Sequence, residues 1–249
     1  MYPLIPLGPT LNIPTYYLVI SLTICICLYW STRRAFAYDL SKKLTLDLGL
    51  LIMVTGFIGG RLFHVLYEDI AYYRESMWRI FEFWNGGFVF YGGALLAGLC
   101  GYLFLRKKDS HRLPTYLDML APLLCFSYAA GRLACLLAGC CFGKYCELPW
   151  AISGRHPTQA YAALWELGVL FILLGIEKGV RESGQPKIFK KSGSLFYLWM
   201  ILHSLGRFIV ESLRDDFRGP EFGISVSSWI SAVIFIYGWY LLLAKPRQN

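Results

Sequence analysis

The chain has 249 residues, of which 56% are hydrophobic and only 16% are charged, and its formal net charge is +8. A soluble domain of average composition carries roughly 25% charged residues, so this composition excludes an ordinary soluble domain. The apolar residues come in long blocks, and a bilayer-spanning helix needs about 20 of them. We therefore expect an all-α integral membrane protein in which residues 1–249 form a single integral-membrane domain.

Seven apolar blocks are long enough to be membrane helices. In chain order they are residues 14–30, 44–67, 86–105, 113–138, 161–176, 194–211 and 222–244. The connections after the first, third and fifth blocks, with the C-terminal tail, hold 15 of the 24 lysines and arginines, whereas the other connections hold 6. Basic residues favour the cytoplasmic side, so this bias predicts a seven-helix bundle with the N-terminus outside and the C-terminus in the cytoplasm. The positive charge is then a topology signal, and we expect no nucleic-acid partner.

Three Gly-Arg pairs lie near the ends of three of these blocks, with their arginines at Arg61, Arg132 and Arg207. An arginine at the edge of a membrane helix is costly unless it has a task or a partner. The predicted topology runs the three helices in the same direction, which places the guanidinium groups at one depth near the outer face. Such a cationic ring suits an anionic lipid headgroup. The alternative for each arginine is that its side chain merely extends to the interface.

The sixth block ends with the largest number of polar residues that could carry chemistry. His203, Arg207 and Glu211 are spaced by four residues and share one helix face. Arg207 could bind a phosphate, His203 could move a proton near neutral pH, and Glu211 could orient either of them. The alternative is an internal Arg-Glu pair that only holds helices together.

At the start of the third block, Gly92 and Gly93 follow Tyr91. Glycines open space around the tyrosine, and a helix start offers free backbone N–H groups to a phosphate, so Tyr91, Gly92 and Gly93 are candidate site residues. The alternative is an interfacial aromatic residue in a tightly packed helix pair.

Before the fifth block lie Arg155, His156 and Gln159, which are candidates for substrate binding on the outer side. Helix capping is the alternative explanation of this segment. Glu166 lies about two turns further along, where an unpaired carboxylate is costly. We expect Glu166 to pair with a buried arginine.

Four of the eight cysteines are clustered at Cys135, Cys140, Cys141 and Cys146. An external position permits disulfides, and the alternatives are packing residues, a catalytic thiol, or a metal or redox site. The spacing is not a CxxC pair and gives little support for zinc, even with His156 nearby. The signatures of nucleotide-binding, serine-hydrolase and zinc-protease enzymes are absent, and we expect neither a cofactor nor a metal.

Taken together, five segments resemble the prolipoprotein diacylglyceryl transferase family. In order they read GGRLFHVLYE, WNGGFVFYGG, GRLACLLAGCCFGKYCELPWAI, RHPTQAYAALWE and GSLFYLWMILHSLGRFIVESLRDD. Each motif is modest alone, whereas their order, spacing and membrane position are specific. The resemblance implies a bacterial inner-membrane enzyme with its active site facing the outer side. It would transfer diacylglyceryl from phosphatidylglycerol to the lipobox cysteine of a prolipoprotein and release glycerol phosphate.

The resemblance also implies roles for particular residues. Arg132 matches the arginine of the family's Gly-Arg signature, Arg207 and Glu211 match its last signature, and the segment 156–159 matches its His-Pro-Ser/Thr-Gln segment. The chain departs from the family at several positions: Tyr91 and His203 replace His and Tyr, Cys135 replaces Asn, Cys140 replaces the Glu of Asn-Gly-Glu, and Ala162 replaces Glu.

These departures leave two other functions open. One is a paralogous lipid-modifying enzyme, with another acceptor or with a covalent intermediate on Cys140 or Cys141. The other is a non-catalytic phospholipid-binding membrane protein.

Overall fold

The computed structural model describes residues 2–6, 12–68, 70–183, 189, 191–215 and 224–244. The described residues divide into two compact units, one formed by the chain up to Cys27 together with the chain from Pro114 onward, and the other by Leu28–Leu113. The first residue of the seventh expected block, Phe222, lies outside the described part, as do five of the basic residues counted above: Lys187, Lys190, Arg218, Lys245 and Arg247. The expectation of a single domain stays a prediction.

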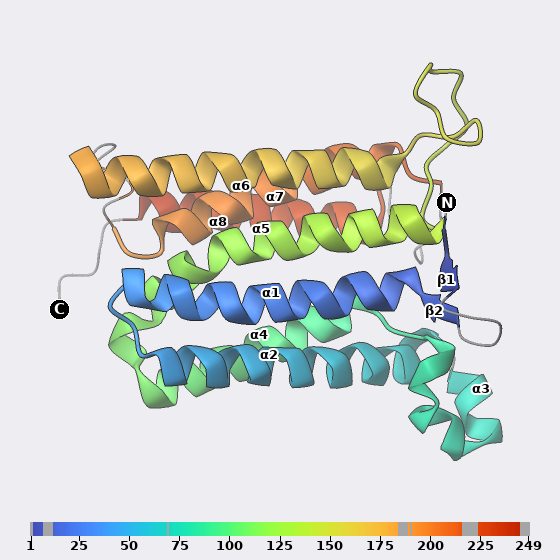
Figure 1. Ribbon diagram of the computed structural model, residues 1–249, viewed down its shortest axis with the longest axis horizontal. Coiled ribbons are helices and arrows are strands. Elements are labelled where there is room, and N and C mark those ends of the chain that lie inside the picture. Colours follow the sequence, from blue (N-terminus) through green and yellow to red (C-terminus); the bar gives the residue numbers. More distant parts are fainter. Residues whose placement is uncertain are drawn as a thin grey trace. The chain divides into compact units, whose positions relative to one another are not determined.

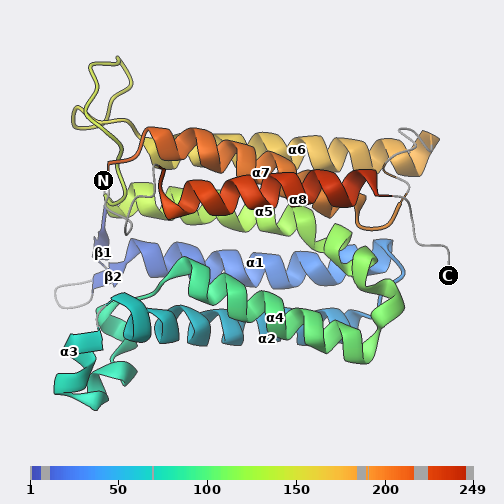
Figure 2. The ribbon, with the colours of Figure 1, turned by 180° about the vertical axis from the view of Figure 1, so that it is seen from behind.

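The first unit contains the start of α1 (Thr15–Ala37), most of α5 (Leu113–Ala138), and α6 (Thr158–Ser183), α7 (Ser194–Ser212) and α8 (Val226–Leu243). The helices α5 to α8 lie side by side in both ribbon views (Figures 1 and 2). Strands β1 (Leu4–Pro6) and β2 (Asn12–Pro14) form a short antiparallel pair in which Ile5 lies opposite Ile13. An all-helical bundle is the expected solution where the solvent cannot hydrogen-bond the backbone.

The second unit is built mainly from α2 (Lys42–Phe63) and α4 (Phe90–Lys108). A π-helical turn, His64–Glu68, continues α2, and α3 (Ile70–Glu75) and two 3₁₀ turns, Met77–Phe81 and Phe83–Asn85, lead to α4. A further 3₁₀ turn, Ser110–Arg112, follows α4. The sequence did not predict α3 or these short turns.

All seven expected apolar blocks contain a long helix, although several boundaries differ. The third helix begins at Phe90 rather than at residue 86, because Gly86 and Gly87 have φ angles of 80° and 78° that a helix cannot accept. The fifth helix ends at Ser183 rather than at residue 176. Glu177 and Arg181 form an ion pair of 2.7 Å across one turn of this extension.

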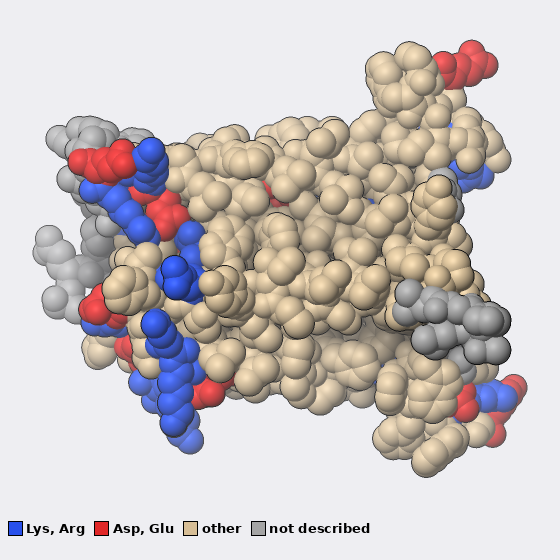
Figure 3. All heavy atoms as spheres, in the orientation of Figure 1, with Lys and Arg blue, Asp and Glu red and all other residues tan. Residues whose placement is uncertain are grey.

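Five of the described helices are long and apolar enough to span a membrane: Thr15–Ala37, Lys42–Tyr67, Ser110–Ala138, Thr158–Glu182 and Val226–Leu243. A multi-span helical membrane protein is therefore supported by length and composition. On the face seen in Figure 3, Lys, Arg, Asp and Glu gather at the helix ends, and the surface between the ends is almost free of charge. This pattern suits a protein whose middle section faces hydrocarbon.

Within the first unit, α5 and α7 are joined by a buried carboxylate. Asp118 accepts hydrogen bonds from the backbone N–H of Gly193 at 2.6 Å and of Phe196 at 3.0 Å. The first N–H groups of a helix have no partner inside the helix, so Asp118 caps α7 from the neighbouring helix. This contact fixes where α7 begins relative to α5.

In the second unit, glycines let α2 and α4 approach closely. A Cβ atom on Gly92 would lie 2.3 Å from the Phe63 ring and 2.7 Å from the carbonyl oxygen of Gly59. Small residues at such crossings are typical of membrane helix pairs. Gly92 and Gly93 are both buried, as the helix-packing alternative expects, and their role as site residues stays a prediction.

We predict that Gly92→Ala destabilises the protein, because the added methyl group must displace Phe63 or the α2 backbone. Overpacking of this kind costs roughly 1–3 kcal/mol. The matched control is Gly98→Ala on the same helix, where nothing lies within 4 Å of the new Cβ. Thermal unfolding of the detergent-purified variants should show a lower midpoint for Gly92→Ala only. Equal midpoints for the two variants would contradict the close packing of α2 against α4.

Candidate active site

A histidine–glutamate pair lies between α6 and α7. His203 Nδ1 is 2.5 Å from Glu166 Oε1, and their side chains are only 16% and 2% exposed. The ring of Trp199 stacks on His203 with centroids 5.0 Å apart, and Tyr128 contacts it edge-on at 4.8 Å. With Nδ1 hydrogen-bonded to Glu166, Nε2 is the ring nitrogen left for chemistry.

The expectation that Glu166 pairs with a buried arginine is wrong. Its partner is His203, because Arg207, one turn further along α7, already pairs with a carboxylate of its own helix. The register of α6 against α7 brings His203 opposite Glu166: the Trp165 indole donates to the Leu202 carbonyl at 2.9 Å and its ring packs on Gly206.

Arg207 and Glu211 form the internal pair that the sequence offered as one alternative. Arg207 Nη1 lies 2.5 Å from Glu211 Oε2, each side chain is 7% exposed, and Ser225 donates to Glu211 Oε1 at 2.9 Å. Among the described residues, Nη2 of Arg207 and Oε2 of Glu166 are buried without a hydrogen-bond partner. Such groups are costly unless a ligand completes their bonding, and the ion pair alone does not use the planar donor fork of the guanidinium.

Arg132 is connected to the same cluster through Tyr128. Its Nη2 donates to the Tyr128 hydroxyl at 3.0 Å, and the guanidinium carbon lies 5.0 Å from the centre of that ring. Tyr128 in turn contacts His203. Arg132, Tyr128, His203 and Glu166 therefore form one chain of contacts, and the Arg207–Glu211 pair begins one helical turn after His203 on α7.

The segment between α5 and α6 is fastened to the first turn of α6 and the last turn of α7. Gln159 Nε2 donates to the Cys140 carbonyl, and Thr158 Oγ1 donates to the Cys141 carbonyl at 2.9 Å. The backbone of Lys144 pairs with that of Leu213. In the described part of the chain, the buried Gln159 Oε1 keeps an unused acceptor, so Gln159 could still receive a donor from a ligand.

Arg155 and His156 lie in the same segment but have local partners. Arg155 donates to the Tyr145 hydroxyl at 2.9 Å and pairs with Asp215 at 3.4 Å. His156 Nδ1 lies 3.4 Å from the Tyr161 hydroxyl. These contacts hold the segment together, and the substrate-binding role of both residues stays a prediction.

Arg61 lies in the other unit, where backbone carbonyls surround it. Its guanidinium donates to five carbonyl oxygens, those of Arg79, Ile80, Glu82, Gly86 and Gly87. Arg61 therefore organises the turns between α3 and α4, a task that the sequence did not indicate. The structure describes the two units separately, so the expected ring of Arg61, Arg132 and Arg207, like the placement of Tyr91 against this cluster, stays a prediction.

Arg61 also lines an apolar cavity of about 710 Å³ within its unit. The other lining side chains are mostly hydrophobic, such as Phe57, Leu62, Val65 and Ile80. With its N–H groups occupied by carbonyls, the arginine adds little polarity, and the cavity suits hydrocarbon.

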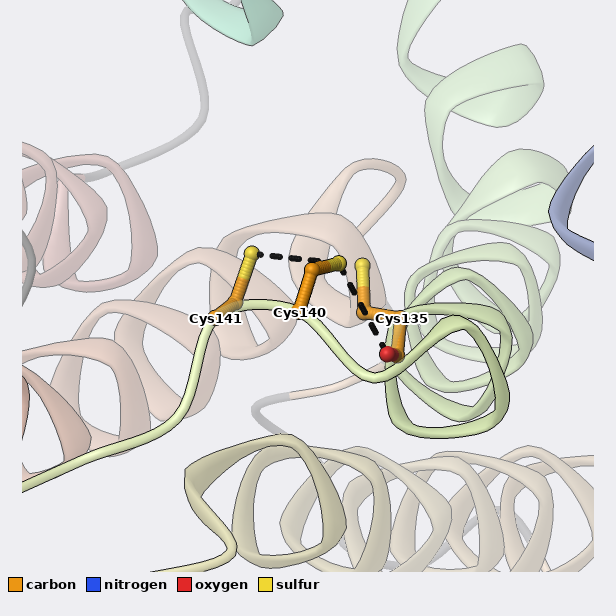
Figure 4. Close-up of side chains that lie close together, drawn as sticks. All are labelled: Cys135, Cys140 and Cys141. Carbon is orange, nitrogen blue, oxygen red and sulfur yellow. Dashed lines mark hydrogen bonds between the residues drawn. The ribbon is translucent and has the colours of Figure 1, made fainter. Parts of the chain in front are cut away.

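Three of the four clustered cysteines converge (Figure 4). The sulfurs of Cys135, Cys140 and Cys141 all lie within 4.8 Å of one another, whereas Cys146 is outside this group. All eight cysteines of the chain fall in the described part and are free thiols. Hydrogen bonds from the Cys135 and Cys140 thiols, together with the Arg214 guanidinium, lower the pKa of Cys141.

The class of protein is now defined: a helical membrane protein with a buried, incompletely bonded arginine beside a His–Glu pair. Comparison with known proteins gives its family. The sequence profile of the family described as prolipoprotein diacylglyceryl transferase matches residues 3–244, so the chain belongs to this family.

Several curated relatives carry the name phosphatidylglycerol–prolipoprotein diacylglyceryl transferase. The protein of Paenarthrobacter aurescens is 27% identical over 98% of this chain and 82% of its own length. That of Clostridium tetani is 28% identical over 93% and 92%, and that of Polynucleobacter asymbioticus is 34% identical over 74% and 71%. The family resemblance expected from the five motifs is confirmed.

We predict that Glu166→Ala lowers the stability of the protein, since it leaves His203 without its buried partner. An unsatisfied buried group costs about 1–3 kcal/mol. Glu166→Gln should cost less, because an amide oxygen still accepts a hydrogen bond from Nδ1. The matched control is Glu182→Ala on the same helix, whose side chain is 67% exposed and whose ion pair contributes little. Thermal unfolding of the three variants in detergent measures these effects. A Glu166→Ala midpoint equal to that of Glu182→Ala would contradict the buried pairing of Glu166 with His203.

Proposed function

We propose that this protein transfers a diacylglyceryl group from phosphatidylglycerol to the lipobox cysteine of a prolipoprotein. The observation that carries the proposal is Arg207, a buried guanidinium with unused donors one helical turn from the His203–Glu166 pair. Family membership and the printed names of the relatives give the donor and the acceptor their chemical identity.

The reaction needs an anion site and a proton acceptor. In our proposal Arg207 and Arg132 bind the phosphate and stabilise the negative charge that develops as it leaves. Glu211 holds Arg207 in place, and Glu166 orients His203 so that Nε2 can take the thiol proton. The acceptor sulfur then attacks the glyceryl carbon: a C–S bond forms, the C–O bond to the phosphate breaks, and glycerol phosphate leaves with the bonding electrons.

The proposal includes the remaining predicted groups in supporting roles. Gln159, with its unused buried oxygen, is placed near the headgroup hydroxyls, while Arg155 and His156 shape the segment above it. Tyr91, in the other unit, stays a predicted catalytic residue. Within that unit, the apolar cavity beside Arg61 suits hydrocarbon such as an acyl chain. No cofactor is part of this scheme.

We further propose seven membrane spans in a bacterial inner membrane, with the N-terminus and the active site on the outer side. The bias of lysine and arginine toward alternate connections supports this topology. The helices α4 and α7, which are not among the five candidate spans, each have 19 residues. At 1.5 Å per residue each is about 28 Å long, close to the thickness of the hydrocarbon core.

The direct test incubates the purified protein with radiolabelled phosphatidylglycerol and a lipobox peptide. We expect label on the peptide in a thioether that resists mild base. Release of glycerol phosphate without labelled peptide would instead favour another acceptor. Binding of the phospholipid without release of glycerol phosphate would favour a non-catalytic lipid-binding protein.

We predict that Arg132→Lys and Arg207→Lys each lower activity roughly 10- to 100-fold. A charged hydrogen bond contributes about 1.5–3 kcal/mol, and lysine offers a point charge in place of a two-pronged donor. The matched control is Arg33→Lys, since Arg33 is exposed on α1. Initial rates at saturating peptide measure the effect. Normal turnover in both lysine variants would show that these arginines are structural.

The base is tested separately from the cysteines. His203→Gln keeps a hydrogen-bonding partner for Glu166 but provides no base, so activity should fall about 10²–10⁴-fold. A Cys140→Ser/Cys141→Ser double variant should keep most of its activity, because the reactive thiol belongs to the substrate. Intact mass separates the covalent alternative: a lipid adduct on the native protein, with an inactive double variant, would assign the nucleophile to these cysteines.

A further inference from the structure

The turn that ends α5 brings the thiols of Cys135, Cys140 and Cys141 close together. Gly139, with a φ angle of 77°, ends the helix in the left-handed region that glycine adopts most easily. The Cys140 N–H then bonds the Cys135 carbonyl at 3.1 Å and the Gly139 N–H bonds the Leu136 carbonyl at 3.2 Å. This is the Schellman arrangement, which turns the chain back over the last helical turn. It brings Cys140 over Cys135.

Cys141 joins them through an unusual backbone conformation. Its φ angle is 67°, a left-handed value that residues with a side chain rarely adopt. The Sγ atoms of Cys140 and Cys141 lie 3.6 Å apart, and Figure 4 shows the three sulfurs on the same side of the chain. The Gln159 and Thr158 side chains hold the carbonyls of these two cysteines, so the geometry is supported from α6.

The spacing of the sulfurs matches a metal site. Sulfur ligands at about 2.3 Å from a central ion lie roughly 3.8–4.0 Å from one another. The three sulfurs already lie within 4.8 Å of one another, so shifts of a few tenths of an ångström bring them to that separation. Cys140 is exposed, which gives an ion a path from the surface.

We propose that Cys135, Cys140 and Cys141 bind one soft, thiol-seeking d¹⁰ cation, Cu(I) in preference to Zn(II). Thiolate sulfur selects such ions over Mg²⁺ or Ca²⁺. Three thiolates can complete a trigonal Cu(I) shell, whereas Zn(II) usually takes a fourth ligand. Three thiolates around Cu(I) leave two negative charges, and the guanidinium groups of Arg132 and Arg214 lie within electrostatic range to offset them. Binding of a cation by these thiols does not require the proposed transfer reaction.

The test titrates the reduced, detergent-purified protein with Cu(I) under anaerobic conditions, with bathocuproine disulfonate as the competing chelator. We expect one Cu(I) per chain that resists the chelator, a higher unfolding temperature on binding, and an X-ray absorption spectrum with about three sulfur neighbours. Zn(II) added alone should bind more weakly in the same assay.

Single variants identify the ligands. Three variants, Cys135→Ser, Cys140→Ser and Cys141→Ser, should each lose the Cu(I) ion that resists the chelator and the rise in unfolding temperature that Cu(I) causes. The control variant Cys100→Ser, on α4, should keep both. Unfolding of the metal-free variants checks that they fold. Retention of the chelator-resistant Cu(I) ion by any of the three variants overturns the proposal. A wild-type protein that holds no Cu(I) against the chelator also overturns the proposal.

Discussion

The candidate site depends on how α6 lies against α7. The Trp165 ring occupies the space that a side chain at position 206 would fill, and its indole N–H bonds a carbonyl of the facing helix. This contact fixes the register, and the register decides which polar groups meet in the bundle. Glu166 lies opposite His203 because of it, and Arg207 is left to pair along its own helix.

Buried polar groups in a membrane bundle are expensive, so their arrangement limits what the protein can do. Backbone groups satisfy two of them: Asp118 caps α7, and Arg61 is surrounded by backbone carbonyls. Arg207 differs, because its Nη2 is buried and lacks a hydrogen bond within the described residues, while its Nη1 contacts Glu211. The difference separates an arginine that stabilises turns from one that is suited to binding an anion.

The cysteine cluster follows the same reasoning at the end of α5. Positions where the family resemblance leads us to expect Asn and Glu carry thiols here, next to Arg132. Three thiolates and a phosphate are both stabilised by nearby positive charge, and Arg132 lies within electrostatic range of the Cys140 thiol. The loop that carries Cys140 and Cys141 is also held by Gln159, so an ion bound there would reinforce one wall of the proposed lipid site.

The sequence by itself determined the helical membrane class, the approximate limits of seven helices and the family. Each of these follows from local composition or from motifs that can be recognised from the order of the residues alone. It also placed His203, Arg207 and Glu211 on one face, because helical spacing is periodic. The partner of Glu166, the bridging role of Tyr128 and the carbonyl cage of Arg61 were decided only by tertiary structure. These contacts join residues 18 or more positions apart, or depend on rotamers and helix register, and no local pattern encodes them.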